Sequence, residues 1–241
     1  MLCLDLPITG YARALDIQNE IVERIVLHGD PDVLILLEHP PTVTLGVRGS
    51  MSHLLVPGDE LRRRGVGFHT VDRGGEATYH GPGQLVGYPL VNLKTLGLSA
   101  RDYVNGLEET ILLVIESFGV RGFRRKGAAG VWTGENCKIA SIGVRIRRRV
   151  TSHGFGLNVS SADPGDLIIS CGKPGIRMVN LHDLVKRPIS MDAVREAVKS
   201  CFGKVFRVGI EQCSLEHLGL QSSAAERQSR RPSADKPDHE M

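Results

Sequence analysis

The sequence predicts an α+β fold in a single domain, mainly from the order of its helical and extended segments. Three segments have the apolar spacing of amphipathic helices, and extended runs lie between them in groups. A doubly wound sheet needs a regular alternation of strand and helix, so this irregular order favours a mixed sheet flanked by helices. The length of 241 residues and the hydrophobic content of 41% allow one substantial core, which we expect within residues 1–220.

The first half of the chain is predicted to contain one long helix and several strands. Residues 9–28 are apolar at every fourth position from Ile17 to Ile25, and Gly29 is placed to end this helix. A short helix is expected at 59–64. The strands are apolar or β-branched runs bounded by glycine or proline, and they cover residues 33–37, 42–45, 67–72, 77–80 and 85–92.

The second half is predicted to contain two capped helices with strands between them. Ser99 and Asp102 have the spacing of a capping box, which opens a helix that ends near Phe118. Ser190 caps the last helix, at 191–202. The intervening strands, of which the first two form a hairpin around a turn at 133–136, are residues 131–132, 138–146, 154–159 and 167–170.

The remaining composition bears on compartment and partners. Residues 221–241 are polar without apolar periodicity, so we expect a disordered tail. Residues 1–10 lack the basic n-region and long apolar stretch expected of a secretory signal, and no window approaches the roughly 20 apolar residues of a membrane helix. Five cysteines without a C-x-x-C pair suggest neither a disulfide framework nor a zinc site. We therefore expect a cytoplasmic monomer without a metal, and neither a nucleic acid nor a membrane as partner.

Basic residues gather in two short clusters, although the net charge is only +3. The first basic cluster consists of Arg121, Arg124, Arg125 and Lys126. The second consists of Arg145 and Arg147 to Arg149. Such runs are either solvated faces or a docking patch for an acidic partner, and the sequence leaves both open.

A glycine-rich segment is the first candidate for a ligand site. It combines a cation, two glycines, a hydroxyl, a phenol and an imidazole, in the order Arg73, Gly74, Gly75, Glu76, Ala77, Thr78, Tyr79 and His80. Glycines allow a ligand to approach the backbone closely. The alternative is a glycine-rich pair of turns in which His80 is an ordinary hydrogen-bonded residue.

Lys138 is the second candidate, because of its position in the predicted strand 138–146. Side chains alternate along a strand, so Lys138 should share the apolar face with Ala140 and Ile142, while Ser141 and Gly143 point the other way. An ammonium on an apolar face is partly desolvated and acts strongly on any nearby acid. The alternative is that Lys138 lies at the strand end and extends to water.

Cys171 is the third candidate, at the end of the predicted strand 167–170 and the start of a Gly/Pro loop. Most lone cysteines are small buried hydrophobes. A thiol becomes a nucleophile at neutral pH when a nearby cation stabilises the thiolate, and Lys138 is a candidate for that cation.

These segments together resemble the lipoyl(octanoyl) transferases, the octanoyl-carrier-protein-to-protein transferases of lipoate biosynthesis. The segment 73–88 is similar to the signature of that family, and the resemblance extends over residues 4–218. It also includes, in the order of the family, residues 37–41, 44–46, 130–132, Lys138 with 141–143, 153–158 and 170–172.

The resemblance implies a dyad of Cys171 and Lys138. The cysteine of such enzymes takes octanoyl from the phosphopantetheine thioester of acyl carrier protein. It then yields the acyl group to a lysine of a lipoyl carrier domain, in 2-oxoacid dehydrogenases or the glycine cleavage H protein. The substrate pocket of the family maps onto Arg73 to His80 and onto Ser141, Ile142, Gly143, Gly154, Phe155 and Gly156. The implied fold is that of the biotin and lipoate protein ligases.

The chemistry implied needs no cofactor, because exchange between thioesters is nearly isoenergetic and formation of the amide drives the second step. No G-x-x-x-x-G-K-[ST] phosphate loop occurs in the sequence. Acyl carrier protein is acidic as a class, so the basic clusters are candidates for its docking surface. Gly154 and Gly156 are expected to leave room for the acyl chain.

Several alternatives remain open on the sequence. An ATP-dependent lipoate or biotin protein ligase would share the fold without needing a cysteine. A carrier-to-carrier octanoyl amidotransferase would differ in its donor, and a non-enzymatic carrier-binding module would bury Cys171. Cys137 is a second thiol, which strand alternation directs away from Lys138. His80 either assists deprotonation of the acceptor or shapes the pocket, and we favour shaping.

Overall fold

The computed structural model describes residues 1–162, 165–185 and 187–220, and the predicted tail at 221–241 lies outside these residues. The described chain forms a large and a small sheet. The large sheet has the order β12-β1-β2-β6-β10-β9-β8-β7, with β11 beside β9. Its strands are β1 (Leu2–Ile8), β2 (Val33–Glu38), β6 (Gln84–Leu90), β7 (Phe123–Arg124), β8 (Gly130–Gly134), β9 (Cys137–Arg147), β10 (Val150–Asn158), β11 (Arg177–Met178) and β12 (Glu211–Cys213).

The large sheet is mixed, as the sequence predicts. β1 runs parallel to β2 and β12, and β11 runs parallel to β9. The pairs from β2 through β6, β10, β9 and β8 to β7 are antiparallel. The predicted α+β class is confirmed.

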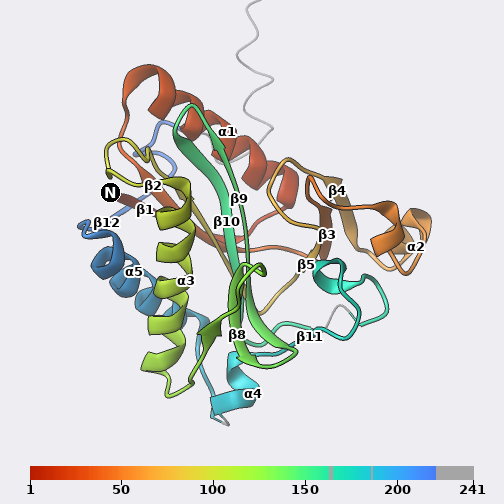
Figure 1. Ribbon diagram of the computed structural model, residues 1–241. Helices are drawn as coiled ribbons and strands as arrows, with labels where there is room; N and C mark the ends of the chain where they lie inside the picture. The colour runs from red at the N-terminus through yellow and green to blue at the C-terminus, as the bar shows by residue number, and fades with distance from the viewer. Residues whose placement is uncertain (163–164, 186, 221–241) are drawn as a thin grey trace, which may run out of the picture.

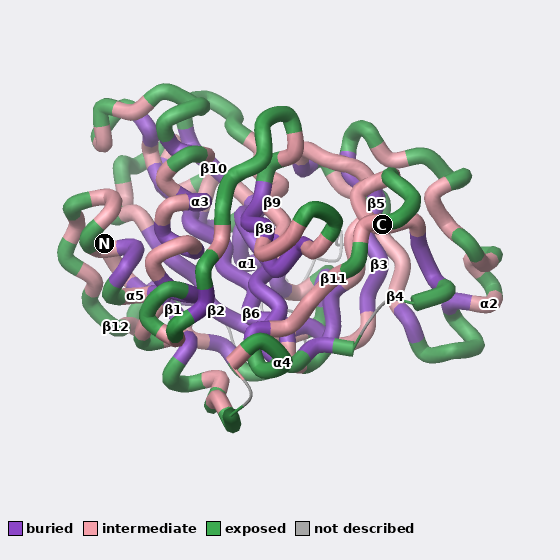
Figure 2. Tube along the Cα trace, turned by 60° about the horizontal axis from the view of Figure 1, so that its bottom comes forward, coloured by how far each residue is buried: buried purple, intermediate pink, exposed green. Residues whose placement is uncertain are grey.

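Helices cover both faces of the large sheet. α1 (Tyr11–His28) lies on one face, and α3 (Ala100–Ser117) and α5 (Met191–Phe206) pack together on the other (Figure 1). Apolar side chains of β2 point to both faces of the sheet, so both faces must be buried. Leu34 and Leu36 belong to the core under α3, and Ile35 belongs to the core under α1. Figure 2 shows these central strands buried along most of their length. A short helix, α4 (Leu181–Val185), precedes α5.

A small sheet extends from one edge of the molecule (Figure 1). It has the order β4-β3-β5, with β3 (Thr42–Leu45), β4 (Gly67–Thr70) and β5 (Ala77–His80). The short helix α2 (Gly58–Arg63) and a helical turn, η1 (Met51–His53), complete this region. It has its own apolar cluster, which includes Val43, Leu45, Leu61, Val66, Ala77, Leu167 and Ile168.

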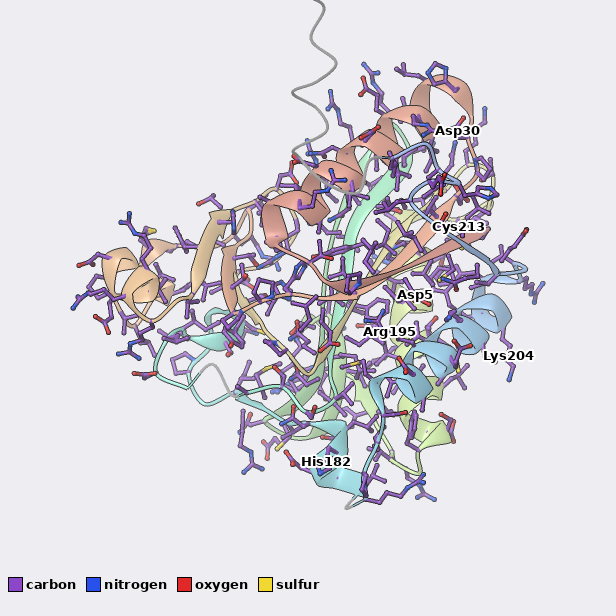
Figure 3. The ribbon with its side chains drawn as sticks, turned by 180° about the vertical axis from the view of Figure 1, so that it is seen from behind. Asp5, Asp30, His182, Arg195, Lys204 and Cys213 are labelled. Atoms are coloured by element: carbon purple, nitrogen blue, oxygen red, sulfur yellow. The ribbon has the colours of Figure 1, made fainter. Side chains whose placement is uncertain are left out.

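An ionic contact ties α5 to the large sheet. Arg195 of α5 lies near Asp5 of β1 (Figure 3), with 3.5 Å between Nη1 and Oδ1. The same guanidinium donates to the carbonyl of Leu36 at 2.9 Å and to that of Leu6 at 3.3 Å. The contact lies where the register of β1 on β2 shifts after Asp5, so the cation satisfies carbonyl groups at an irregular part of the ladder.

The predicted helices occur close to their expected bounds. Ser99 and Asp102 form the capping box, with the Asp102 N–H donating to Ser99 Oγ at 3.1 Å. Gly29 ends α1 in the left-handed conformation. The strand β1 was not predicted, and the predicted strand at 167–170 is wrong. Only an isolated bridge between Leu54 and Ile168 forms there, because Leu167 and Ile168 both bury their side chains in the apolar cluster of the small sheet.

Among the described residues, no helix is long and apolar enough to cross a membrane.

Candidate active site

Cys171 lies in a helical turn, η2 (Ser170–Gly172), that rests on the small sheet. The N–H of Ile169 donates to the carbonyl of His53 at 2.8 Å. Cys171 itself has a φ of 56°, and Gly172 follows at 61°. A left-handed conformation costs an ordinary residue about 1–2 kcal/mol, so the surrounding contacts must hold this turn in place. The result is a half-buried thiol at the tip of a turn.

Lys138 approaches that thiol from β9 of the large sheet. Its Nζ lies 3.3 Å from Sγ of Cys171, and the side chain is only 4% exposed. The ammonium also lies 5.2 Å from the centre of the Trp132 ring, within the range of a cation–π contact. A Cβ at Gly130 would come within 2.6 Å of Lys138 Cε, so the glycine leaves space for the lysine stem.

The predicted face of Lys138 is wrong, because the β8–β9 pairing is irregular at this point. Trp132 pairs with Lys138 and Val131 with Ala140, which leaves one extra residue in β9. Ala140 consequently packs in the main core, while Lys138 lines a cavity with Ser141. The expected burial of the ammonium is present nonetheless.

The cavity beside Cys171 and Lys138 has a volume of about 280 Å³ and lies between the two sheets. It brings together most of the predicted pocket residues: Arg73, Gly75, Glu76, Ala77, Thr78, His80, Ser141, Ile142, Gly143, Gly154, Phe155 and Gly156. Gly74 and Tyr79 are not among its lining residues. The N–H of Gly74 donates to the carbonyl of Val144 at 2.9 Å, and Tyr79 lines a second hollow.

The second hollow, of about 30 Å³, adjoins the first at Cys171. Both hollows are also lined by Ala77, Thr78 and Ser141. Its wall is rich in polar groups, including the hydroxyl of Ser161 and the side-chain amides of Gln84 and Asn158. A polar space of this size accommodates a water molecule.

Arg73 is a buried cation that organises the glycine-rich loop. It is 6% exposed, and its guanidinium donates to the carbonyls of Thr44, Gly74 and Glu76 at 2.9–3.0 Å and to the hydroxyl of Thr44 at 2.8 Å. Burial lowers the pKa of this guanidinium. Its hydrogen bonds go to neutral oxygens, so the cation is held by dipoles of the loop and of β3.

The inner wall of the cavity contains imidazole and phenol groups. Burial lowers the pKa of His153 to about 4 and that of His80 to about 3, so both rings are neutral at pH 7. His80 Nδ1 contacts the amide oxygen of Gln84 at 2.7 Å, and His153 Nε2 contacts Asp72 Oδ1 at 2.9 Å. Amide and carboxylate oxygens only accept hydrogen bonds, so His80 Nδ1 and His153 Nε2 carry the ring hydrogens. The other ring nitrogens, His80 Nε2 and His153 Nδ1, carry no hydrogen.

Tyr88 also lines the cavity, and His39 lies behind it. His39 Nδ1 contacts the carbonyl of Thr9 at 2.6 Å and must donate to it, so its Nε2 accepts from the Tyr88 hydroxyl at 2.7 Å. Burial lowers the pKa of His39 to about 4 and raises that of Tyr88 well above its usual value. The hydroxyl of Tyr88 is thereby fixed in orientation.

Some cavity residues were not predicted, and the sequence carried a signal for only part of them. Tyr11, Tyr88, Trp132 and His153 all line the cavity. Tyr88, Trp132 and His153 each lie within a segment of the family resemblance, whereas nothing in the pattern of α1 distinguishes Tyr11.

Gly154 and Gly156 line the cavity and also lie against strand β6. A Cβ at Gly154 would lie 2.8 Å from Pro89 Cδ, and one at Gly156 would lie 2.8 Å from Gln84 Oε1. These glycines allow β6 to approach β10 closely.

Within residues 1–162, 165–185 and 187–220, no group of three or more His, Cys, Asp or Glu side chains could hold a metal ion. All five cysteines are free thiols.

The chain is similar to known proteins over most of its length. Residues 10–203 match the family described as the lipoyl protein ligase A/B catalytic domain. An octanoyltransferase of Syntrophotalea carbinolica is 44% identical over 215 residues, which cover 89% of this chain and 98% of the relative. An octanoyltransferase of Syntrophobacter fumaroxidans is 38% identical over 216 residues, covering 89% of this chain and 94% of the relative.

Solved structures of ligases are similar in fold. Lipoate-protein ligase A bound with ATP has a TM-score of 0.72 at 18% identity, with 97% of this chain and 96% of that chain covered. The putative lipoate protein ligase of T. acidophilum with bound lipoic acid has a TM-score of 0.70 at 17% identity, with 88% of each chain covered. The predicted fold, a mixed sheet flanked by helices as in these ligases, is confirmed.

Proposed function

The chain belongs to the lipoyl protein ligase A/B catalytic-domain family, among its octanoyltransferases, and we propose that it carries octanoyl from acyl carrier protein through a thioester on Cys171. The acceptor in this proposal is the ε-amine of a lysine in a lipoyl carrier domain. The observation that carries the proposal is the 3.3 Å contact between Lys138 Nζ and Cys171 Sγ beside a buried cavity.

The first step forms the acyl-enzyme. The sulfur of Cys171 attacks the carbonyl carbon of the octanoyl thioester, a new carbon–sulfur bond forms, and the bond to the pantetheine sulfur breaks. The Lys138 amino group takes the proton of the Cys171 thiol as the thiolate forms, and the resulting ammonium gives a proton to the departing pantetheine sulfur; Nζ lies 3.3 Å from Sγ, within reach for this transfer. One thioester replaces another, so this step needs no nucleotide.

The second step forms the amide. The neutral ε-amine of the acceptor lysine attacks the thioester carbon, the bond to Cys171 breaks, and the proton lost from nitrogen returns to the dyad. His80 shapes the cavity in this proposal, because Gln84 fixes its ring through Nδ1. The acyl group is held by the cavity residues Arg73, Gly75 to Thr78, His80, 141–143 and 154–156.

The test of this mechanism is intact-mass spectrometry of the protein mixed with octanoyl-acyl carrier protein. We expect one octanoyl adduct, labile to hydroxylamine, on the wild type and on Cys137→Ser, and none on Cys171→Ser. Cys137 is a matched control, because its Sγ lies outside both hollows and accepts from Arg177 Nη2 at 3.2 Å. An adduct retained by Cys171→Ser and lost by Cys137→Ser would reverse the assignment.

The ligase alternative is tested in the same experiment. If ATP and free octanoate acylate a lipoyl domain while no enzyme adduct forms, the protein acts as an ATP-dependent ligase. We expect the opposite result, with transfer from the acyl-enzyme to the domain in the absence of ATP.

We further propose that the donor carrier docks at the first basic cluster. Arg125 and Lys126 are exposed and directly precede residues 127–129, which line the cavity. Arg147 of the second cluster is nine residues along β9 from Lys138, which corresponds to roughly 30 Å. Proximity to Lys138 and Cys171 therefore favours the first cluster over the second.

Charge reversal distinguishes the two clusters. The double variant Arg125→Glu and Lys126→Glu should slow formation of the acyl-enzyme about tenfold or more at low salt, with a weaker dependence on ionic strength. The matched double variant Arg147→Glu and Arg148→Glu should have a smaller effect. Equal rates for both double variants would contradict docking at the first cluster.

A further inference from the structure

The cavity has an open end at the dyad and a closed end some distance away. The dyad end is bordered by exposed residues, among them Lys173. The other end is bordered by Tyr11, Tyr88 and His153, of which none is more than 4% exposed. A chain attached to Cys171 can therefore enter the cavity and extend toward these three side chains.

The depth of the cavity follows from the register of β9 on β10. Ser141, which lines the cavity beside Cys171, pairs with Gly156, whereas His153 pairs with Val144. The two positions are three residues apart, which corresponds to about 10 Å along a strand. An eight-carbon acyl chain has seven carbon–carbon bonds of about 1.5 Å, and their zigzag spans roughly 9 Å.

The volume of the cavity is also sufficient for an octanoyl group. A cavity of about 150 Å³ holds a benzene molecule, with its six carbons. By the same ratio, the 280 Å³ available here holds about eleven heavy atoms, which is enough for the nine of an octanoyl group. The limit on chain length is therefore set by the depth of the cavity and not by its volume.

Two of the three side chains at the closed end are fixed by hydrogen bonds. The Tyr88 hydroxyl donates to His39, and His153 is held by Asp72 through its ring and by Gln18 through its backbone N–H at 2.9 Å. Tyr11 differs from them. Among the described residues it makes ring contacts with His39, His69 and His80, at 5.0–5.9 Å between ring centres, and no side-chain hydrogen bond.

We propose that Tyr11, Tyr88 and His153 form the end wall that sets the length of the acyl group, and that Tyr11 is the residue through which this length can be changed. The proposal rests on the proposed function, since it requires an acyl chain on Cys171. Tyr88 and His153 belong to strands of the large sheet, so their positions are rigid. Tyr11 is the first residue of α1 and packs only through its ring, so a smaller side chain there opens the end of the cavity.

The test is a competition among donors of different length. The protein is mixed with equimolar hexanoyl-, octanoyl-, decanoyl- and dodecanoyl-acyl carrier protein, and the adducts on Cys171 are quantified by intact mass. We expect octanoyl to predominate on the wild type. A methylene that does not fit changes selectivity about 10–200-fold, so Tyr11→Ala should raise the ratio of decanoyl to octanoyl at least tenfold. Tyr11→Trp should shift the ratio toward hexanoyl.

Two controls isolate the length effect. Tyr11→Phe retains the ring and should keep the wild-type ratios. Phe206→Ala removes an aromatic ring from the core beside Tyr103, outside the cavity, and should also keep them. Thermal melting shows which variants are folded, and Tyr11→Trp tests the wall if Tyr11→Ala does not fold.

The outcomes separate this inference from the proposed function. Wild-type ratios in both Tyr11→Ala and Tyr11→Trp, with the adduct on Cys171 intact, would overturn the end wall alone. Absence of an adduct on the wild type with every donor would overturn the proposed function and, with it, the end wall.

Discussion

Acid should destabilise this protein through the buried histidines at the cavity wall, and His39 gives the clearest test. Its pKa is lowered from 6.5 to about 4, chiefly by burial. In the unfolded chain the imidazole becomes charged as the pH falls below 6.5, while in the folded protein it stays neutral. The unfolded state then binds more protons than the folded state, so stability is lost as the pH falls from 6.5 toward 4.

The size of this loss of stability follows from the difference between the two pKa values of His39. Each pH unit between the two pKa values corresponds to about 1.36 kcal/mol, so His39 lowers the free energy of unfolding by about 2 kcal/mol between pH 6.5 and pH 5. His80 and His153, whose pKa values are lowered to about 3 and about 4, act in the same direction. Together the three can remove up to about 6 kcal/mol at pH 5, which is comparable with the total stability of many domains.

The assay compares the pH dependence of stability in two variants. Urea unfolding of the wild type, His39→Gln and His28→Gln is followed by circular dichroism at pH 7 and pH 5. His39→Gln replaces the imidazole acceptor of Tyr88 with an amide of different geometry and should be less stable at pH 7, but its loss between pH 7 and pH 5 should be about 2 kcal/mol smaller. His28→Gln, at the exposed end of α1, controls for removal of an imidazole. Equal losses in all three proteins would refute the reasoning.

Two further predictions concern the sheet and the turn beside the cavity. A Cβ at Gly87 would overlap the ring of Phe155, so Gly87→Ala should lower the free energy of unfolding by about 1–3 kcal/mol in a urea titration. Gly10→Ala, where nothing lies within 4 Å of the new Cβ, is the control and should not destabilise. Glu38 Oε2 accepts from the Gly83 N–H at 2.7 Å, so Glu38→Gln should speed hydrogen exchange of that amide, and unchanged protection would contradict this role.

The elements that could be predicted are those whose signals are local. The capping box of Ser99 and Asp102 satisfies the start of α3 within four residues of chain, and Gly29 ends α1 by its own conformation. β1 carried a signal as well. Leu2, Leu4 and Leu6 alternate with other residues and all pack under α1, and Pro7 and Gly10 follow them, so the period-2 pattern of a strand was present although it was not used.

The features that were predicted wrongly depend on partners distant in the sequence. The extra residue in β9 arises from its register on β8, and no local pattern indicates it. The segment 167–170 has the composition of a strand, but Leu167 and Ile168 bury their side chains together against Leu61 and Val66. Adjacent side chains can be buried on the same side only in an irregular segment, and the core that buries them forms only after the chain has folded.

The same dependence explains why the two candidate catalytic residues could be identified while their geometry could not. Cys171 belongs to the region of the small sheet and Lys138 to the large sheet, so the distance between them depends on how the two sheets are joined. The loop of Arg73 makes this connection, since its guanidinium binds Thr44 of β3 while the Gly74 N–H binds Val144 of β9.

Close approach of this loop to β9 also requires Gly143, where a Cβ would lie 2.7 Å from the Gly74 oxygen. A larger side chain at Gly143 would push the Arg73 loop away from β9, and the small sheet would move with it. Such a change would alter the distance from Lys138 to Cys171 without touching either residue. Gly143→Val should therefore, under the proposed mechanism, impair formation of the acyl-enzyme even with the shortest donors, in intact-mass measurements.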